Sequence, residues 1–253
     1  MPDRVRFRSP LGFWLVCTPL DGGQYWRLGR YERGTLWLID TLLESGDVFI
    51  DIGASVGQMS FHAAGRVGSA GSVLAFEPSS HRFQDLSDGV SANGFSQVRP
   101  INAALSDAAG ERSLSHDGIS PSMVGADDGR EVEVVQTRCL DDALDELLTG
   151  AEHQRIRLVK IDVEGAEREV IGGADRLLSS EHAPVVCFEH GHAPVGMGSV
   201  FDALAAHGYE FLRFPIGQYA DGPLTALDGE PWAHTGENVV AIPPNFARER
   251  LTD

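Results

Sequence analysis

Two acidic residues follow apolar stretches of the chain where small residues gather. Asp51 lies in "VFIDIGASVG" (48–57), where Gly53 and Gly57 complete the spacing D-x-G-x-x-x-G, and Glu77 follows "SVLAF". Glycine adopts positive φ and keeps Cβ atoms away from whatever lies against the backbone. An acid after the second strand of a nucleotide-binding sheet accepts the ribose hydroxyls. The pattern therefore favours a cofactor of the nucleotide type.

Two classes of cofactor compete for this glycine turn. A dinucleotide site requires G-x-G-x-x-G, but Ser55 follows Gly53 at the second position and the third glycine is absent. S-Adenosylmethionine carries a positive sulfonium and no phosphate, so the carboxylate of Asp51 suits its amino acid part. A third interpretation is that Gly53 and Gly57 serve only to pack a helix on a strand.

Further cofactor contacts are predicted where the second and third apolar stretches end. Asn102 and Ala103 lie where an adenine edge would sit. Ala54 in the glycine turn, and Pro78 and Ser79 after Glu77, complete the predicted cofactor set. Pro78 and Ser79 equally suit a helix N-terminus that needs no ligand.

The elements that must position these residues alternate between strands and helices. Apolar runs predict strands at 47–53, 72–78, 98–105, 156–165, 184–191, 209–214 and 238–244, with an extra strand at 131–138. A polar stretch occupies 107–130, and one helix is expected over 166–180. Near-continuous apolar strands alternating with helices predict a doubly wound parallel sheet, whose ligands bind beyond the carboxyl ends of the strands. We expect an N-terminal cap at 1–45 and the main domain at 46–253.

Composition narrows the possible partners and compartment. The formal net charge is -17, which repels nucleic acid backbones and anionic lipid, so neither nucleic acid nor a membrane is an expected partner. Cys17, Cys139 and Cys187 are widely spaced and form no CxxC pair, which argues against a structural zinc site and fits the reducing cytoplasm. The oligomeric state is not evident from the chain.

The blocks "KIDVEGAE" (160–167) and the glycine turn, in this order and spacing, resemble the FkbM family of S-adenosylmethionine-dependent methyltransferases. The resemblance covers about residues 29–192 and includes "AFEPS", "INAALSDAAG", "TRCLDDAL" and "VVCFEHG". It departs from the family at Ala54-Ser55, where the family usually has Ala-Asn. The change keeps a small polar group, so cofactor binding is still expected.

The resemblance implies a Rossmann-like class I methyltransferase, an α/β fold whose seven-stranded, mostly parallel sheet has an antiparallel last strand. It also implies methyl transfer to a hydroxyl of a small molecule such as a polyketide or a sugar. At the positions that match the family motifs, the resemblance implies that the turn from Asp51 to Gly57 holds the methionine part of the cofactor and that Glu77 holds the ribose. Glu32, in "GRYE", matches a family glutamate that closes the site from the cap.

Methyl transfer to an alcohol requires a group that removes the hydroxyl proton. We predict that His190 is this base, because imidazole titrates close to working pH. Asp162 would orient His190 or contact the cofactor amine, and Glu164 would hold the acceptor hydroxyl. Two structural alternatives stay open: His190 as a loop residue, and Glu164 as a charge at a helix start.

A metal-assisted version is the alternative to a base. Asp162, Glu189 and His190 would hold Mg²⁺, which prefers oxygen ligands and needs only one or two carboxylates. Two rival functions also remain at this point. One is a nicotinamide-dependent oxidoreductase, which the missing third glycine disfavours, and the other is an inactive cofactor-binding module.

Overall fold

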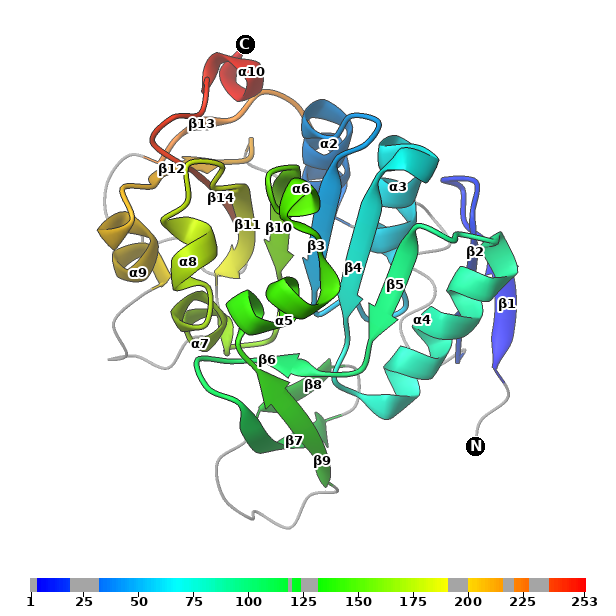
Figure 1. Cartoon of the computed structure of the whole chain (residues 1–253). Helices are drawn as coiled ribbons and strands as arrows, with labels where there is room; N and C mark the ends of the chain where they lie inside the picture. The colour runs from blue at the N-terminus through cyan, green and yellow to red at the C-terminus, as the bar shows by residue number, and fades with distance from the viewer. Residues whose placement is uncertain are drawn as a thin grey trace.

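The computed structural model describes residues 4–18, 32–117, 120–123, 132–190, 200–215, 221–227 and 237–253. At its centre, eight strands form one sheet in the order β13-β12-β14-β11-β10-β3-β4-β5 (Figure 1). These strands are β3 (Val48–Ile52), β4 (Ser72–Phe76), β5 (Val98–Ile101), β10 (Ile156–Ile161), β11 (Val185–His190), β12 (Glu210–Arg213), β13 (Thr225–Ala226) and β14 (Glu237–Ile242).

The direction of the strands confirms the predicted fold. Strands β5, β4, β3, β10 and β11 pair in parallel, and the last long strand, β14, runs antiparallel to both β11 and β12. The short strand β13 adds an eighth member at the edge. The strand order reverses between β3 and β10, and in such sheets the ligand lies beyond the carboxyl ends at this reversal.

Helices cover both faces of the sheet, and strand alternation divides the core between them (Figure 1). On one face, Phe49, Leu158 and Cys187 share a core cluster with α2 (Arg33–Leu42), α3 (Gln58–Val67), α4 (Ser80–Asn93) and α10 (Glu249–Thr252). On the other, Ile50, Ile161 and Phe188 pack with α5 (Leu140–Leu147), α7 (Glu167–Gly172), α8 (Asp175–Leu178) and α9 (Val200–Ala206). The remaining short helices are η1 (Gly68–Ala70) and α6 (Gly150–His153).

The N-terminal hairpin of β1 (Val5–Arg8) and β2 (Trp14–Cys17) lies beside α4. The Asn93 side chain accepts a hydrogen bond from the Trp14 amide at 2.7 Å and donates one to the Trp14 carbonyl at 2.8 Å. Phe13 meets Phe61 edge-on at 5.8 Å, so the hairpin contributes to the same core as α3. Residues 1–3 and 19–31 of the predicted cap lie outside the described residues, and its role as a cap stays a prediction.

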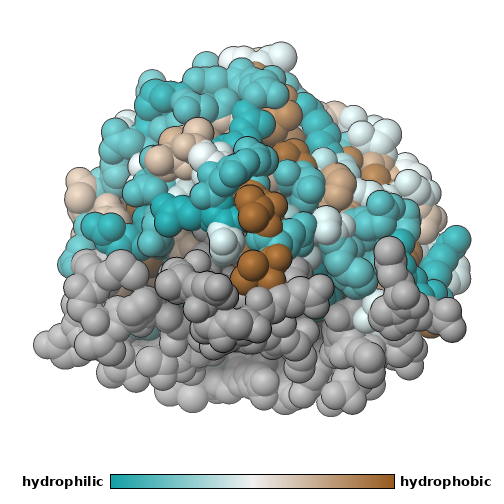
Figure 2. Space-filling model, turned by 90° about the horizontal axis from the view of Figure 1, so that it is seen from below, coloured by the Kyte–Doolittle hydropathy of each residue, from teal (hydrophilic) through white to brown (hydrophobic). Residues whose placement is uncertain are grey.

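A second sheet lies below the carboxyl ends of the central strands (Figure 1). Its order is β6-β9-β7-β8, built from β6 (Ala104–Leu105), β7 (Gly110–Asp117), β8 (Ser120–Met123) and β9 (Val132–Arg138). Seen from below, the described surface is mostly hydrophilic, with a small hydrophobic patch beside the residues drawn in grey (Figure 2). Val132 and Val134 of β9 are the exposed large apolar residues in the described part of the chain.

Two predicted elements were wrong, and one stretch for which no element was predicted contains strands. The polar stretch at 107–130 contains β7 and β8, and the strand expected over 98–105 is broken between β5 and β6. The helix expected over 166–180 is divided into α7 and α8 near Gly173, where a Cβ would lie 2.2 Å from the Ser106 carbonyl oxygen. Across the described ranges, no helix is long and apolar enough to span a bilayer.

Candidate active site

Strand register brings polar side chains together at the carboxyl edge of the sheet. Lys160 of β10 lies opposite Asp51 of β3 on one side and Cys187 of β11 on the other. Because side chains alternate along a strand, these three residues share the face covered by α2 and α3. Lys160 is 4% exposed, yet its Nζ donates a hydrogen bond to Asp162 Oδ2 at 2.9 Å.

The glycine turn after β3 is in direct contact with the turn after β10. Gly53 has φ 79°, and a Cβ there would lie 1.8 Å from the Asp162 carbonyl oxygen. The Asp162 amide donates to the Ile52 carbonyl at 3.0 Å. Gly57 has φ 90° and would bring a Cβ to 2.6 Å from the Phe61 ring. Both glycines are thus required by packing, and the turn that they permit also positions Asp51.

Asp51 is a buried acid with one unsatisfied oxygen. It is 1% exposed, and its Oδ2 accepts a hydrogen bond from the Ser60 hydroxyl at 2.5 Å. Within the part of the chain that the structure describes, its Oδ1 is buried and has no hydrogen-bond partner. Burial raises the pKa of Asp51, although Lys160 opposes this. A buried oxygen of this kind is costly without a donor, and the ammonium of an amino acid ligand would supply one.

Glu77 binds the backbone of its own turn and of the glycine turn. Its carboxylate accepts hydrogen bonds from the backbone amide of Ser55 at 2.8 Å and from that of Ser79 at 2.9 Å. Burial raises its pKa to about 7. Each carboxylate oxygen has a second lone pair, so these bonds leave capacity for hydroxyl donors. Glu77 therefore joins the two turns and can still accept from a ribose.

Asn102 has a structural role beside Glu77. Its side-chain amide donates to the carbonyls of Glu77 and Pro78, both at 2.9 Å. Ala103 is 4% exposed, and its amide donates to the Ile101 carbonyl at 3.1 Å. The pair breaks the strand expected over 98–105 and fixes the turn after β4, so both residues lie beside the predicted adenine side of the site.

Glu32 reaches the same edge from the start of α2. It adopts a left-handed backbone conformation with φ 46°, and its Oε2 accepts hydrogen bonds from the Thr35 hydroxyl at 3.0 Å and from the Asn238 side-chain amide at 3.1 Å.

Lys160 keeps its charge although it is buried. Burial acts to lower the pKa of Lys160, but the nearby carboxylates of Asp162, Glu32 and Asp51 raise it well above the ordinary value. Lys160 thus remains cationic among these acids.

Asp162, Glu164 and Glu189 form a carboxylate cluster at this edge. One oxygen of each lies within 4.8 Å of one oxygen of the others. Burial, followed by the charges of Asp162 and Glu164, raises the pKa of Glu189 to about 8. The predicted metal set of Asp162, Glu189 and His190 differs from this cluster, in which Glu164 takes the place of His190. The His190 ring instead meets Phe201 of α9 edge-on at 5.0 Å.

The turn after β10 depends on a residue that the sequence analysis missed. Glu167 is 4% exposed, and its Oε1 accepts the amides of Val163 at 3.3 Å and Gly165 at 3.1 Å. Glu164 adopts φ 54° in the same turn and is half-buried. The helix-start role considered for Glu164 is therefore filled by Glu167. Lys160 was also missed, although a lysine inside a buried apolar run is itself a signal.

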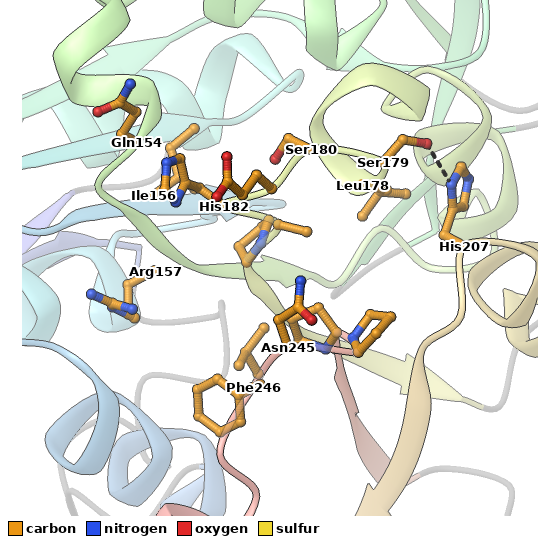
Figure 3. Close-up of a pocket in the computed structure, with 16 residues that line it drawn as sticks. Gln154, Ile156, Arg157, Leu178, Ser179, Ser180, His182, His207, Asn245 and Phe246 are labelled. Atoms are coloured by element: carbon orange, nitrogen blue, oxygen red, sulfur yellow. Dashed lines mark hydrogen bonds between the residues drawn. The ribbon is translucent and has the colours of Figure 1, made fainter.

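A cavity of about 480 Å³ lies at the opposite, amino edge of the sheet. Figure 3 shows Arg157, His182, His207, Asn245 and Phe246 around it, with the Ser179 hydroxyl bound to His207 Nδ1 at 3.0 Å. It contains none of the residues predicted to bind cofactor or acceptor. The hollow and the candidate chemistry thus occupy opposite edges.

The strand order, the antiparallel last strand and the turns after β3 and β4 define a class I methyltransferase fold. A family model described as "Methyltransferase FkbM domain" matches residues 51–211. The chain belongs to this family and is an S-adenosylmethionine-dependent methyltransferase. This confirms the resemblance seen in the sequence and excludes the nicotinamide-dependent alternative.

Two relatives illustrate the similarity. "Hexuronic acid methyltransferase AglP" of Haloferax volcanii is 30% identical over 196 residues, which cover 74% of this chain and 77% of that protein. The crystal structure of "Methyltransferase FkbM" from Methylobacillus flagellatus KT matches with a TM-score of 0.51 and 17% identity. That match covers 86% of this chain but only 46% of the other, so it supports the fold alone.

Proposed function

We propose that this enzyme methylates an oxygen atom of a small sugar acceptor, and specifically a hydroxyl group of a molecule that contains a hexuronic acid. The observation that carries the proposal is the buried, unsatisfied oxygen of Asp51 beside the glycine turn of an FkbM methyltransferase domain. The relative that acts on a hexuronic acid supports the sugar class of acceptor.

The cofactor would lie across the turns after β3 and β4. Asp51 would accept the ammonium, and the turn of Gly53, Ala54, Ser55 and Gly57 would face the methionine part. Glu77 would accept the ribose hydroxyls, while Pro78, Ser79, Asn102 and Ala103 would line the adenine side. Glu32 and Asp162 complete the acidic rim on the side of the amino acid. S-Adenosylmethionine supplies an activated methyl group on a positive sulfur, and an acidic rim attracts that charge.

The enzyme's own residues must align the acceptor oxygen and receive its proton. Alignment contributes about 7–11 kcal/mol to such transfers. The carboxylates of Asp162, Glu164 and Glu189 would repel an acceptor carboxylate, which favours a hydroxyl as the receiving atom. His190 as the base and Glu164 as the hydroxyl contact stay predictions.

Magnesium assistance is a second mechanism at the same edge. Oxygen ligands are what Mg²⁺ prefers, and the cluster of Asp162, Glu164 and Glu189 offers three carboxylates. If the metal acts, chelator treatment removes turnover, added Mg²⁺ restores it, and cofactor affinity is unchanged. Turnover that survives the chelator leaves the metal-free mechanism.

The test is a methyl-transfer assay with methyl glucuronide, which offers hydroxyls and one carboxylate. We expect cofactor-dependent gain of one methyl group, detected by mass spectrometry, in a product that resists mild alkali as an ether does. An alkali-labile product would be an ester and would overturn the hydroxyl assignment. Asp51→Ala is the matched control, because it should abolish cofactor binding. Cofactor binding without any transfer to a panel of sugar acceptors would overturn the proposed sugar class of acceptor.

A further inference from the structure

Strand alternation separates two neighbouring ionisable residues at the end of β11. Cys187 belongs to the core cluster under α2 and α3, whereas Phe188 belongs to the cluster under α7 and α9. Glu189 and His190 continue this alternation. Consistent with it, Glu189 meets Asp162 and Glu164, while the His190 ring packs on Phe201. The two side chains therefore lie on opposite faces of the sheet.

The face that holds Glu189 also carries Asp51, one of the candidate cofactor residues. Asp51, Lys160 and Cys187 are register neighbours there, and Lys160 donates to Asp162. Asn238 of β14, the register partner of Glu189, is neutral and binds Glu32. The acids Asp162, Glu164 and Glu32 act on Glu189, and the cation Lys160 donates its hydrogen bond to Asp162. More negative than positive groups face this point.

The buried, unpartnered oxygen of Asp51 is a separate observation that points to a cationic ligand on the same face. Asp51 lies opposite Lys160, whose ammonium is directed to Asp162. A ligand with its ammonium at Asp51 would extend past Asp162 toward Glu189. The positive sulfur of the methyl donor then comes to the acidic cluster, where opposite charges are favourable.

We infer that Glu189, rather than His190, faces the methyl group being transferred and takes the proton of the acceptor hydroxyl. This inference rests on the proposed function. During transfer, the acceptor oxygen forms its bond to the methyl carbon as its O–H bond breaks. The proton passes to the Glu189 carboxylate. The sulfur keeps the electron pair of the broken S–CH₃ bond, and S-adenosylhomocysteine leaves as a neutral thioether.

The test compares binding of S-adenosylmethionine with binding of S-adenosylhomocysteine, which lacks the methyl group and its positive charge. Isothermal titration calorimetry is performed on the wild type, Glu189→Gln and the matched neighbour His190→Gln. Above about pH 8, where the Glu189 carboxyl is ionised, we expect Glu189→Gln to weaken binding of S-adenosylmethionine about tenfold. Binding of S-adenosylhomocysteine should change little, because only S-adenosylmethionine pairs a positive charge with Glu189. His190→Gln should leave the affinity ratio unchanged.

The outcomes separate the inference from the proposed function. A wild type that binds neither compound refutes the proposed function. A wild type that binds both, with the same affinity ratio in Glu189→Gln, overturns the inference alone, as does a changed ratio in His190→Gln. Glu189→Asp keeps the charge but withdraws the carboxylate, so it should preserve the ratio and lower turnover. A Glu189→Asp variant with unchanged turnover would also contradict the inference.

Discussion

The two edges of the central sheet differ in what their side chains leave unsatisfied. At the carboxyl edge, acids are crowded around one lysine, and a buried oxygen of Asp51 has no donor among the described residues. At the amino edge, a cavity of about 480 Å³ is open, but none of its described lining residues holds a buried polar atom without a partner. The candidate active site is therefore identified by its crowded acids and the unpartnered Asp51 oxygen, and not by the presence of a cavity.

The largest effect is expected from a substitution at Gly53. Substitution to alanine places a Cβ 1.8 Å from the Asp162 carbonyl and forces an L side chain into φ 79°. We expect the free energy of unfolding to fall by roughly 3 kcal/mol or more, with loss of cofactor binding. Gly65→Ala in α3 is the matched control, because nothing lies within 4 Å of its Cβ position. It should stabilise the helix by about 0.5–1 kcal/mol. Urea unfolding of both variants measures the contrast.

Asp51→Asn tests the unsatisfied oxygen itself. A charged acceptor bond contributes about 1.5–3 kcal/mol, so cofactor affinity should fall by about 10- to 100-fold. Stability of the free protein should be unchanged or higher, because a buried charge is removed. Asp85→Asn is the control, since Asp85 of α4 is also buried and its Oδ2 also has no hydrogen-bond partner among the described residues, but its Oδ1 binds Arg4 next to the N-terminal hairpin. That variant should lose stability and keep cofactor affinity, as calorimetry and thermal unfolding would show. Equal affinity of Asp51→Asn and the wild type would refute the role of Asp51.

The pH dependence of stability tests the burial of Glu77 and its raised pKa. Burial raises its pKa from 4.5 to about 7, so the folded protein holds this proton more tightly than the unfolded chain. Its contribution to stability is therefore complete below about pH 4.5 and is lost as pH rises through about 7, by at most roughly 3 kcal/mol. Glu77→Gln should flatten this part of the profile in urea unfolding between those values. A variant with the same slope as the wild type would contradict the assignment.

The smallest effect is expected at the amino edge. Arg157 lines the cavity, is partly exposed and lies 3.7 Å from Asp47. Arg157→Met should change cofactor affinity by no more than about twofold, as exposed substitutions away from a site usually do. His182→Ala, in the same cavity, should behave alike in the same calorimetric assay. A tenfold loss of cofactor affinity in either variant would indicate that the cofactor binds at the amino edge instead.

Much of the fold followed from the sequence, because the buried parallel strands are continuous apolar runs. The exceptions have local causes that only tertiary contacts reveal. Asn102 interrupts an apolar run by binding carbonyls of the preceding turn, and Gly173 divides a helical pattern through its approach to Ser106. The second sheet, with the order β6-β9-β7-β8, includes polar strands, whose pairing partners are not evident from the periodicity of the sequence.

The site was predictable as far as chain position determines it. Asp51 and Glu189 lie near the carboxyl ends of β3 and β11, and Glu77 and Asp162 directly follow β4 and β10, so their meeting at one edge follows from a parallel sheet. Alternation separates Glu189 from His190, but which face of the strand carries the cofactor residues became clear only from the packing of the sheet, so the two residues were considered together. Lys160 and Glu167 were overlooked because their roles depend on contacts with groups that an isolated sequence does not place beside them.

Hydrogen–deuterium exchange with and without S-adenosylmethionine tests the central claim most directly, since it reports both edges in one experiment. We expect the cofactor to slow exchange in peptides covering 51–57, 77–80 and 162–165, at the carboxyl edge. Peptides covering 178–184 and 243–246, at the amino edge, should exchange at the same rate in both samples. Protection confined to the amino edge, or absent from the carboxyl edge at saturating cofactor, would contradict the assignment of the site.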